Sequence, residues 1–288
     1  MLLFAWASPD RPLTPTDPGS NTYPFQYEKK SIASLGRSVE VFLPRDSSLR
    51  SRKFPVLVFG HGQAIDVAGY EASFIHLAQK GVAVVFPTYD TGFFDQNWLR
   101  MADDFNQMAH ETLSQLENQL DSSQVIYAGH SKGGYVALIA SGADSLGSAG
   151  LNLGALILFA PAGYDKGLIK KINPQLPVTL FWGESDNVIK KSLIDEIYEN
   201  LPNLHKQLIL IKNYPDLKAD HFYPLSKSYF FGGRNGISAY HFYGTWKWLI
   251  GGVLDLSEGA HQTNKYLYGA EALTTGLPEL KHEVKKSW

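Results

Sequence analysis

A single serine stands at the centre of the glycine-rich motif GHSKG at residues 129–133. The motif fits G-x-S-x-G, a sharp turn between a strand and a helix that exposes a nucleophilic serine hydroxyl. An apolar run at 124–128 predicts the strand before it, and a helix is expected over 131–141. The pattern alone also fits a serine that only caps a helix. Its placement between strand and helix favours Ser131 as a nucleophile.

A neutral serine needs a base, and the base needs an acid that orients it. Where this motif is found, these residues follow along the chain in the order serine, acid, histidine. Asp186 comes just after the apolar run 177–182, and His221 lies in the loop after the run 207–211. The sequence therefore predicts that His221 is the base and Asp186 the acid of a triad with Ser131.

Another carboxylate competes for the role of acid. Glu184 lies two residues before Asp186, and Asp216 and Asp220 are weaker candidates near His221. We favour Asp186 because an acid a few residues beyond its strand has room to reach the histidine. The choice between Glu184 and Asp186 stays open at this point.

Acyl transfer also needs backbone N–H groups that stabilise the oxyanion. One is expected from Lys132, directly after the nucleophile, and the second from Gln63, in the loop after the apolar run 54–59.

The remaining histidines have simpler expected roles. His61, in the same loop as Gln63, is expected to shape that loop by hydrogen bonding, and His130 is expected to pack beneath the serine. The other histidines, such as His76, are expected on helices or the surface without partners. No histidine spacing indicates a metal site, so no metal is expected.

Aromatic side chains near the predicted site are candidates for substrate binding. Phe93, Phe94 and Trp98 share one loop, and Phe222 and Tyr223 follow the histidine directly. Such residues also commonly fill a core. If they line the site, the pocket is apolar and suits part of a carboxylic ester.

Composition excludes several other classes of protein. The chain has 288 residues, of which 44% are hydrophobic, and its formal charge is −2, so it is expected to be globular without a nucleic-acid-binding surface. It contains no cysteine, which excludes disulfides and thiolate catalysis. No apolar run reaches the 18 residues or so of a membrane span, so no integral membrane association is expected.

Apolar runs and amphipathic segments alternate along the chain, which predicts an α/β fold with a mostly parallel central sheet covered by helices on both faces. Ligands bind such sheets at the carboxyl ends of the strands. Strands are predicted at 39–43, 54–59, 82–86, 124–128, 154–159, 177–182 and 207–211, and helices at 69–80, 98–120, 131–141, 189–201 and 237–254. The segments that follow strands are 60–63, 87–98, 129–133, 161–164, 183–188 and 213–223.

Three parts are predicted along the chain: a leader at 1–24, a single domain at 25–256 and a C-terminal extension at 257–288. The first residues include Ala5-Trp6-Ala7, a small-x-small pattern that signal peptidases recognise, but they lack basic residues and a long apolar core. This partial signal is compatible with secretion or a periplasmic location and leaves a cytoplasmic location open.

With these motifs in order, the chain from about 39 to 254 resembles the α/β-hydrolases. The motif GHSKGG at 129–134 and GHGQ at 60–63 are similar to the branch with chlorophyllases, platelet-activating-factor-acetylhydrolase-like enzymes, dienelactone hydrolases and cutinase-like polyester hydrolases. The resemblance implies Ser131, Asp186 and His221 as catalytic residues, Gln63 and Lys132 as oxyanion donors, and no separate cofactor. Polyester hydrolases carry Ala-Pro-Trp where this chain has Ala-Pro-Ala at 160–162, and a basic residue after the serine is nearer to chlorophyllases.

The sequence thus favours a serine hydrolase that cleaves a small-molecule or lipid-like carboxylic ester through an acyl-enzyme. A peptidase or an acyltransferase with the same triad is the alternative, as is a non-catalytic binding protein of the same fold. The complete set of three residues argues against the last.

Overall fold

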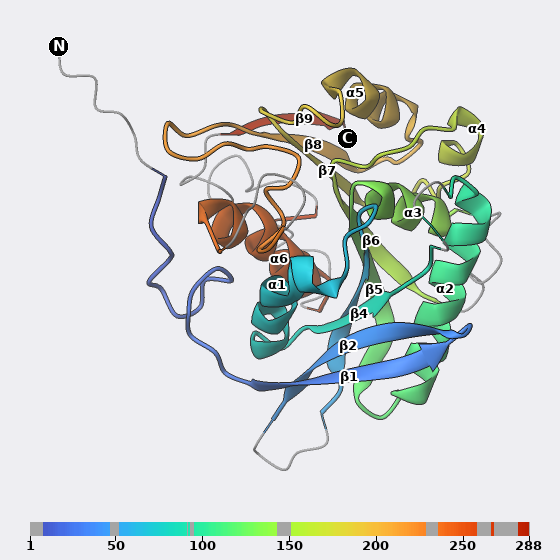
Figure 1. Ribbon diagram of the computed structural model, residues 1–288, viewed down its shortest axis with the longest axis vertical. Coiled ribbons are helices and arrows are strands. Elements are labelled where there is room, and N and C mark those ends of the chain that lie inside the picture. Colours follow the sequence, from blue (N-terminus) through green and yellow to red (C-terminus); the bar gives the residue numbers. More distant parts are fainter. Residues whose placement is uncertain are drawn as a thin grey trace.

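The computed structural model describes residues 8–46, 52–90, 92, 95–142, 151–228, 236–257, 266–267 and 282–287. Phe93 and Phe94 lie outside the described residues, as does the signal-like stretch at 5–7. Within the described chain a nine-stranded sheet runs through the centre of the molecule (Figure 1). Its strands are β1 (Gln26–Ser34), β2 (Arg37–Arg45), β3 (Phe54–Gly60), β4 (Ala83–Pro87), β5 (Leu120–His130), β6 (Leu153–Phe159), β7 (Val178–Gly183), β8 (Lys206–Ile211) and β9 (His282–Ser287).

The strand order is β1-β2-β4-β3-β5-β6-β7-β8-β9. The strands from β4 to β8 in this order all pair in parallel, whereas β1 with β2, β2 with β4, and β8 with β9 pair antiparallel. The predicted α/β fold with a mostly parallel sheet is confirmed. The carboxyl ends of β3, β5, β7 and β8 therefore lie along one edge of the sheet, which is where the predicted site residues follow.

Helices cover both faces of the sheet (Figure 1). In β3, Val56 and Val58 pack into one apolar cluster, while Leu57 and Phe59 pack into the other. This alternation arises because successive strand residues point to opposite faces, and it requires apolar residues at every position. The helices are α1 (Val67–Gln79), α2 (Trp98–Gln115), α3 (Lys132–Ala140), α4 (Lys166–Ile169), α5 (Lys191–Asn200), the π-helix η1 (Tyr240–Trp246) and α6 (Lys247–Ser257).

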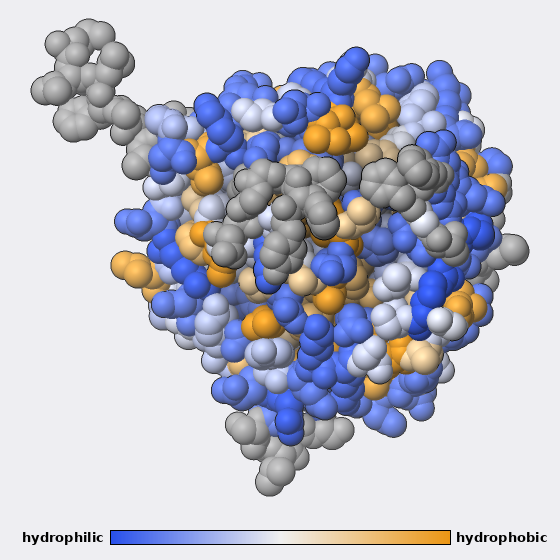
Figure 2. All heavy atoms as spheres, in the orientation of Figure 1, coloured by the Kyte–Doolittle hydropathy of each residue, from blue (hydrophilic) through white to orange (hydrophobic). Residues whose placement is uncertain are grey.

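The first cluster lies beneath α2, α3 and α5, and the second lies beneath α1, η1 and α6. The face of the molecule in Figure 2 is mostly hydrophilic, with apolar residues scattered over it. The helices of the described ranges are all too short or too polar to cross a lipid bilayer.

Several elements differ from the sequence-based prediction. Helix α2 ends at Gln115 and not near Leu120, because Leu120 begins β5 and pairs with Phe54 of β3. The buried Leu120 joins the same apolar cluster as α2, which is why the helical spacing of apolar residues seemed to continue. The late helix is divided into η1 and α6. The edge strands β1 and β9 were not predicted.

Residues 8–24 pack against α1 and η1. His76 of α1 is 2% exposed, its Nε2–H donates to the carbonyl oxygen of Pro18 at 2.7 Å, and its ring stacks on Trp246 at 3.8 Å. Burial lowers the pKa of His76 to about 3, so the imidazole is neutral near pH 7. The expectation that His76 has no partner is wrong, because the N-terminal segment supplies one.

Candidate active site

Ser131 lies at the sharp turn from β5 into α3. Its backbone has φ 55° and ψ −124°, in a region that residues other than glycine rarely adopt. Its N–H donates to the carbonyl oxygen of Phe159 in β6 at 2.8 Å, and its own carbonyl oxygen accepts from the N–H of Ala162 at 2.9 Å. Because the end of β6 and the loop that follows it hold the turn on both sides, the strained backbone is maintained and the hydroxyl stays at the N-terminus of α3.

Two glycines of the motif allow this turn to pack against β3. A Cβ atom at Gly133 would lie 2.1 Å from the carbonyl carbon of Gly60, and one at Gly129 would lie 2.4 Å from the carbonyl oxygen of Gly133. Both distances are to backbone atoms, which cannot move aside as a flexible side chain can. The glycines are therefore required by the close approach of strand and helix.

Substitution of Gly133 by alanine is expected to destabilise the fold by about 3 kcal/mol, because the added methyl group forces β3 and α3 apart. Gly92 offers a matched control, since a Cβ atom there would meet nothing within 4 Å. Chemical denaturation of both variants checks the expectation. Equal stability of Gly133→Ala and Gly92→Ala would contradict it.

The structure brings Ser131, His221 and Asp186 into one hydrogen-bonded chain. Nε2 of His221 lies 3.0 Å from Oγ of Ser131, and Nδ1 lies 2.8 Å from Oδ2 of Asp186. The three residues are 8%, 3% and 8% exposed, respectively. Since a carboxylate only accepts, Nδ1–H of His221 donates to Asp186, and Nε2 is left to accept the hydroxyl proton of Ser131.

Backbone groups fix the carboxylate of Asp186. Its Oδ1 accepts from the N–H groups of Val188 and Ile189 at 2.9 and 2.8 Å, which leaves Oδ2 directed at His221. A carboxylate held by several donors keeps its position.

The competing acids are engaged elsewhere. Glu184 accepts from the N–H of Asn213 at 2.8 Å and from Nζ of Lys212 at 3.3 Å, and these contacts lower the pKa of its carboxyl group. Asp216 binds Ser8, and Asp220 accepts from the N–H of Phe222. Of the four carboxylates, Asp186 is the one that is hydrogen-bonded to His221.

A second hydrogen-bonded chain lies beneath these residues. Nε2–H of His130 donates to the carbonyl oxygen of His221 at 2.8 Å, so Nδ1 must accept, and the hydroxyl of Tyr70 donates to it at 2.9 Å. The hydroxyl oxygen of Tyr70 in turn accepts from the N–H of Gly62 at 2.9 Å. Burial lowers the pKa of His130 and raises that of Tyr70, so both stay neutral. This buried chain joins the loops that carry Ser131, His221 and Gln63. Its contacts were not predicted, although the position of His130 beneath the serine was.

The two expected oxyanion donors lie on neighbouring elements. Lys132 is the first residue of α3, where backbone N–H groups have no partner within the helix, and Gln63 is in the loop between β3 and α1. The N–H of Gly62, one residue earlier, is already used by Tyr70. His61 donates from Nδ1 to the carbonyl oxygen of Gly62 at 3.0 Å, consistent with a role in shaping this loop.

The candidate aromatic residues occupy different environments. Phe222 is half-buried, and its ring centroid lies 5.1 Å from that of His221. Tyr223 is 1% exposed and belongs to the core, and Trp98 packs edge-on against Tyr135 at 4.9 Å. Of the described aromatic candidates, Phe222 is therefore the best placed to contact a ligand at Ser131.

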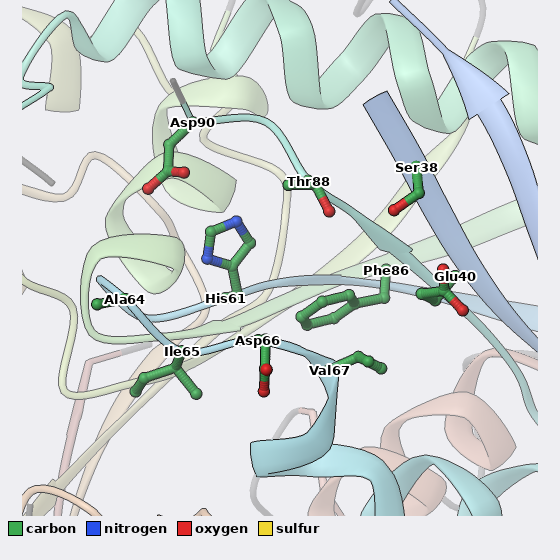
Figure 3. A pocket seen from close by; sticks show the side chains of 10 residues that line it. All are labelled: Ser38, Glu40, His61, Ala64, Ile65, Asp66, Val67, Phe86, Thr88 and Asp90. Carbon is green, nitrogen blue, oxygen red and sulfur yellow. The ribbon is translucent and has the colours of Figure 1, made fainter. Parts of the chain in front are cut away.

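A pocket of about 320 Å³ lies next to the loop of His61 (Figure 3). Its polar lining includes Asp90, which follows β4 and lies 3.4 Å from Nζ of the buried Lys132. Asp90 belongs to the segment 87–98, whose place after a strand is a signal in the sequence for such a residue. Among the described residues, no group of three His, Asp or Glu residues lies close enough to hold a metal ion.

Comparison with known proteins identifies the family. A search of curated proteins finds no match. The family model for chlorophyllase matches residues 20–181, which is more than half of the chain and extends from the N-terminal segment through most of β7, with Gln63, Ser131 and Lys132 inside it. The chain belongs to the chlorophyllase family, within the α/β-hydrolase superfamily.

Proposed function

We propose that this protein is a serine hydrolase that cleaves carboxylic esters through an acyl-enzyme, with Ser131 as nucleophile, His221 as base and Asp186 as the acid that orients it. The observation that carries the proposal is the continuous hydrogen-bonded chain from Oγ of Ser131 through the imidazole of His221 to Asp186. Membership of the chlorophyllase family supports hydrolase activity on an ester.

In the first half of the reaction, Oγ of Ser131 attacks the ester carbonyl carbon while its proton passes to Nε2 of His221. The carbonyl oxygen becomes an oxyanion, which the N–H groups of Gln63 and Lys132 stabilise. His221, positively charged at this stage, is stabilised by Asp186. The tetrahedral intermediate then collapses, the C–O bond to the alcohol breaks, and the proton on Nε2 goes to the departing oxygen.

In the second half, a water molecule takes the place of the alcohol. His221 removes a proton from this water, and the hydroxide attacks the acyl carbon through a second tetrahedral intermediate. When the bond to Oγ breaks, the proton on Nε2 returns to Ser131 and the carboxylic acid leaves. The same two donors stabilise both intermediates.

Hydrolysis of p-nitrophenyl esters from acetate to palmitate tests the proposal. The wild-type protein is expected to release p-nitrophenol, and the acyl chain length with the highest kcat/KM gives the size of the acyl site. Labelling by a fluorophosphonate, which forms a covalent bond with an activated serine, is expected at Ser131 and is read by peptide mass spectrometry. Labelling without ester hydrolysis would favour a peptidase or an acyltransferase, and the absence of both would favour a non-catalytic protein.

The hydrogen bonds among Tyr70, His130 and Gly62 lead to a separate prediction for catalysis. In Tyr70→Phe, His130 loses the donor to Nδ1 and the N–H of Gly62 loses its acceptor. Small displacements of reacting groups lower rates strongly, so kcat is expected to fall by about ten- to a hundredfold with little change in KM.

Tyr127→Phe is the matched control. Tyr127 is also fully buried in the core, and its hydroxyl donates to Asn106 at 2.6 Å, away from the site. Both variants lose a buried hydrogen bond, and both are expected to lose about 1–3 kcal/mol of stability. Steady-state kinetics should separate them. Equal values of kcat in the two variants would show that Tyr70 contributes to stability alone.

A further inference from the structure

The pocket next to the loop of His61 and Gln63 is lined by three acidic side chains. Figure 3 shows side chains from β2, from the loop before α1 and from the end of β4 around one space. Glu40, Asp66 and Asp90 are three of them, together with the apolar Ile65 and Phe86. The pocket thus combines carboxylates with apolar walls.

The positive charges near this pocket do not balance the three carboxylates. Asp90 has Lys132 at 3.4 Å, but Lys29 lies 3.9 Å from Glu40 and only 2.8 Å from Glu71, which therefore holds it more closely. Asp66 caps α1 by accepting from the N–H of Ala68, and within the described ranges it forms no ion pair. The pocket therefore has an excess of negative charge.

His61 gives an independent indication of a ligand. The residue is 5% exposed, its Nδ1–H is used by the carbonyl oxygen of Gly62, and its Nε2 has no hydrogen-bond partner among the described residues. Burial lowers the pKa of His61, so the ring is neutral and Nε2 carries a lone pair. Figure 3 shows the ring rising into the space between Asp90 and Thr88. A buried acceptor next to a carboxylate needs a donor, and a bound ligand can supply it.

We propose that this pocket binds a primary ammonium group of the ester substrate, with His61 as an acceptor and the carboxylates of Asp66, Glu40 and Asp90 supplying negative charge around it. An ammonium brings both the donors and the positive charge that the pocket lacks. The volume of about 320 Å³ is at the lower end of ligand pockets and suits a small head group. The inference rests on the proposed esterase function, since it names the class of ester that the site at Ser131 prefers.

Two pairs of esters that differ in one group test the preference. The first pair is the acetates of 4-(aminomethyl)phenol and 4-ethylphenol, and the second is the p-nitrophenyl esters of 4-(aminomethyl)benzoic acid and 4-ethylbenzoic acid. In each pair a methyl group replaces the ammonium, and the rigid ring prevents attack of the amine on its own ester. For at least one pair, kcat/KM is expected to be about tenfold higher for the ammonium ester, and the ratio should fall as salt is added.

Variants locate the effect in the pocket. Asp66→Asn removes the charge but keeps a residue that caps a helix equally well, so the fold is expected to persist. In the double variant Asp66→Asn with Glu40→Gln, the ratio of kcat/KM for the ammonium ester to that for its ethyl counterpart is expected to fall several-fold. Asp195→Asn is the control, because Asp195 pairs with Lys191 on α5 and lies outside the pocket. It makes the same change of side chain and is expected to leave the ratio unchanged.

The outcomes separate this inference from the proposed function. Hydrolysis of both members of each pair at equal kcat/KM would overturn the ammonium site and leave the esterase. If the folded protein hydrolyses no ester, titration calorimetry of Ser131→Ala with benzylammonium decides whether the pocket binds a cation. Binding that is lost in Asp66→Asn would keep the cation site and overturn the esterase, and the absence of binding would overturn both.

Discussion

Replacement of Ser131 by alanine is expected to lower kcat for p-nitrophenyl ester hydrolysis by about six orders of magnitude, the effect of removing a nucleophile from such a site. In the proposed reaction, Oγ of Ser131 is the atom that forms the covalent bond to the acyl group. Without it, His221 and Asp186 can no longer act in acyl transfer. Any remaining rate above that in water is expected to come from substrate binding and from the proposed oxyanion donors Gln63 and Lys132.

The measurement needs a variant that is folded. Ser131 is 8% exposed, and alanine removes one oxygen atom without adding volume, so thermal unfolding and circular dichroism are expected to match the wild type. Retention of full activity in the folded variant would exclude Ser131 as the nucleophile. Loss of activity together with loss of the fluorophosphonate adduct would support it.

The second largest effect is expected from Asp186→Asn, with a fall in kcat of about four orders of magnitude. An amide can donate a hydrogen bond to Nδ1 of His221, which places the ring proton on Nε2. In that tautomer the histidine cannot accept the proton of Ser131. The backbone donors Val188 and Ile189, which hold Oδ1, favour a side-chain orientation that keeps the amide nitrogen toward the histidine.

Glu184→Gln provides the matched control for this variant, since it also replaces a carboxylate by an amide after β7. The contacts of Glu184 are to Asn213 and Lys212, so kcat is expected to change by less than about twofold. The kinetics of the two variants decide between the acids. A larger loss in Glu184→Gln than in Asp186→Asn would reverse the assignment.

The order of strands and helices was predictable because buried parallel strands appear as continuous apolar runs. The edge strands could not be found in the same way. Strand β1 has exposed and half-buried residues along most of its length, and β9, HEVKKS, has one apolar residue. Their pairing with β2 and β8 depends on contacts between distant parts of the chain, which local sequence patterns do not report.

The proposed catalytic residues were easier to locate from the sequence than the residues that support them. Ser131, Asp186 and His221 each follow a strand, so their meeting at one edge of the sheet follows from the topology. Tyr70 could not be identified, because it is an ordinary aromatic residue in the middle of α1 whose role depends on the distance from its hydroxyl to His130. The pocket of Asp66 and Asp90 was missed because the expected lining was aromatic.

The hydrogen bond between Tyr70 and His130 has a consequence for the divergence of related proteins. The carbonyl oxygen of His221 fixes the tautomer of His130, and Nδ1 of His130 and the N–H of Gly62 together orient the hydroxyl of Tyr70. A substitution at either position leaves a buried donor or acceptor at the other without its partner, so the two positions are costly to change one at a time. In descendants of a common ancestor they should be inherited or exchanged as a pair, which makes this pair a marker of subgroups that is independent of the serine motif.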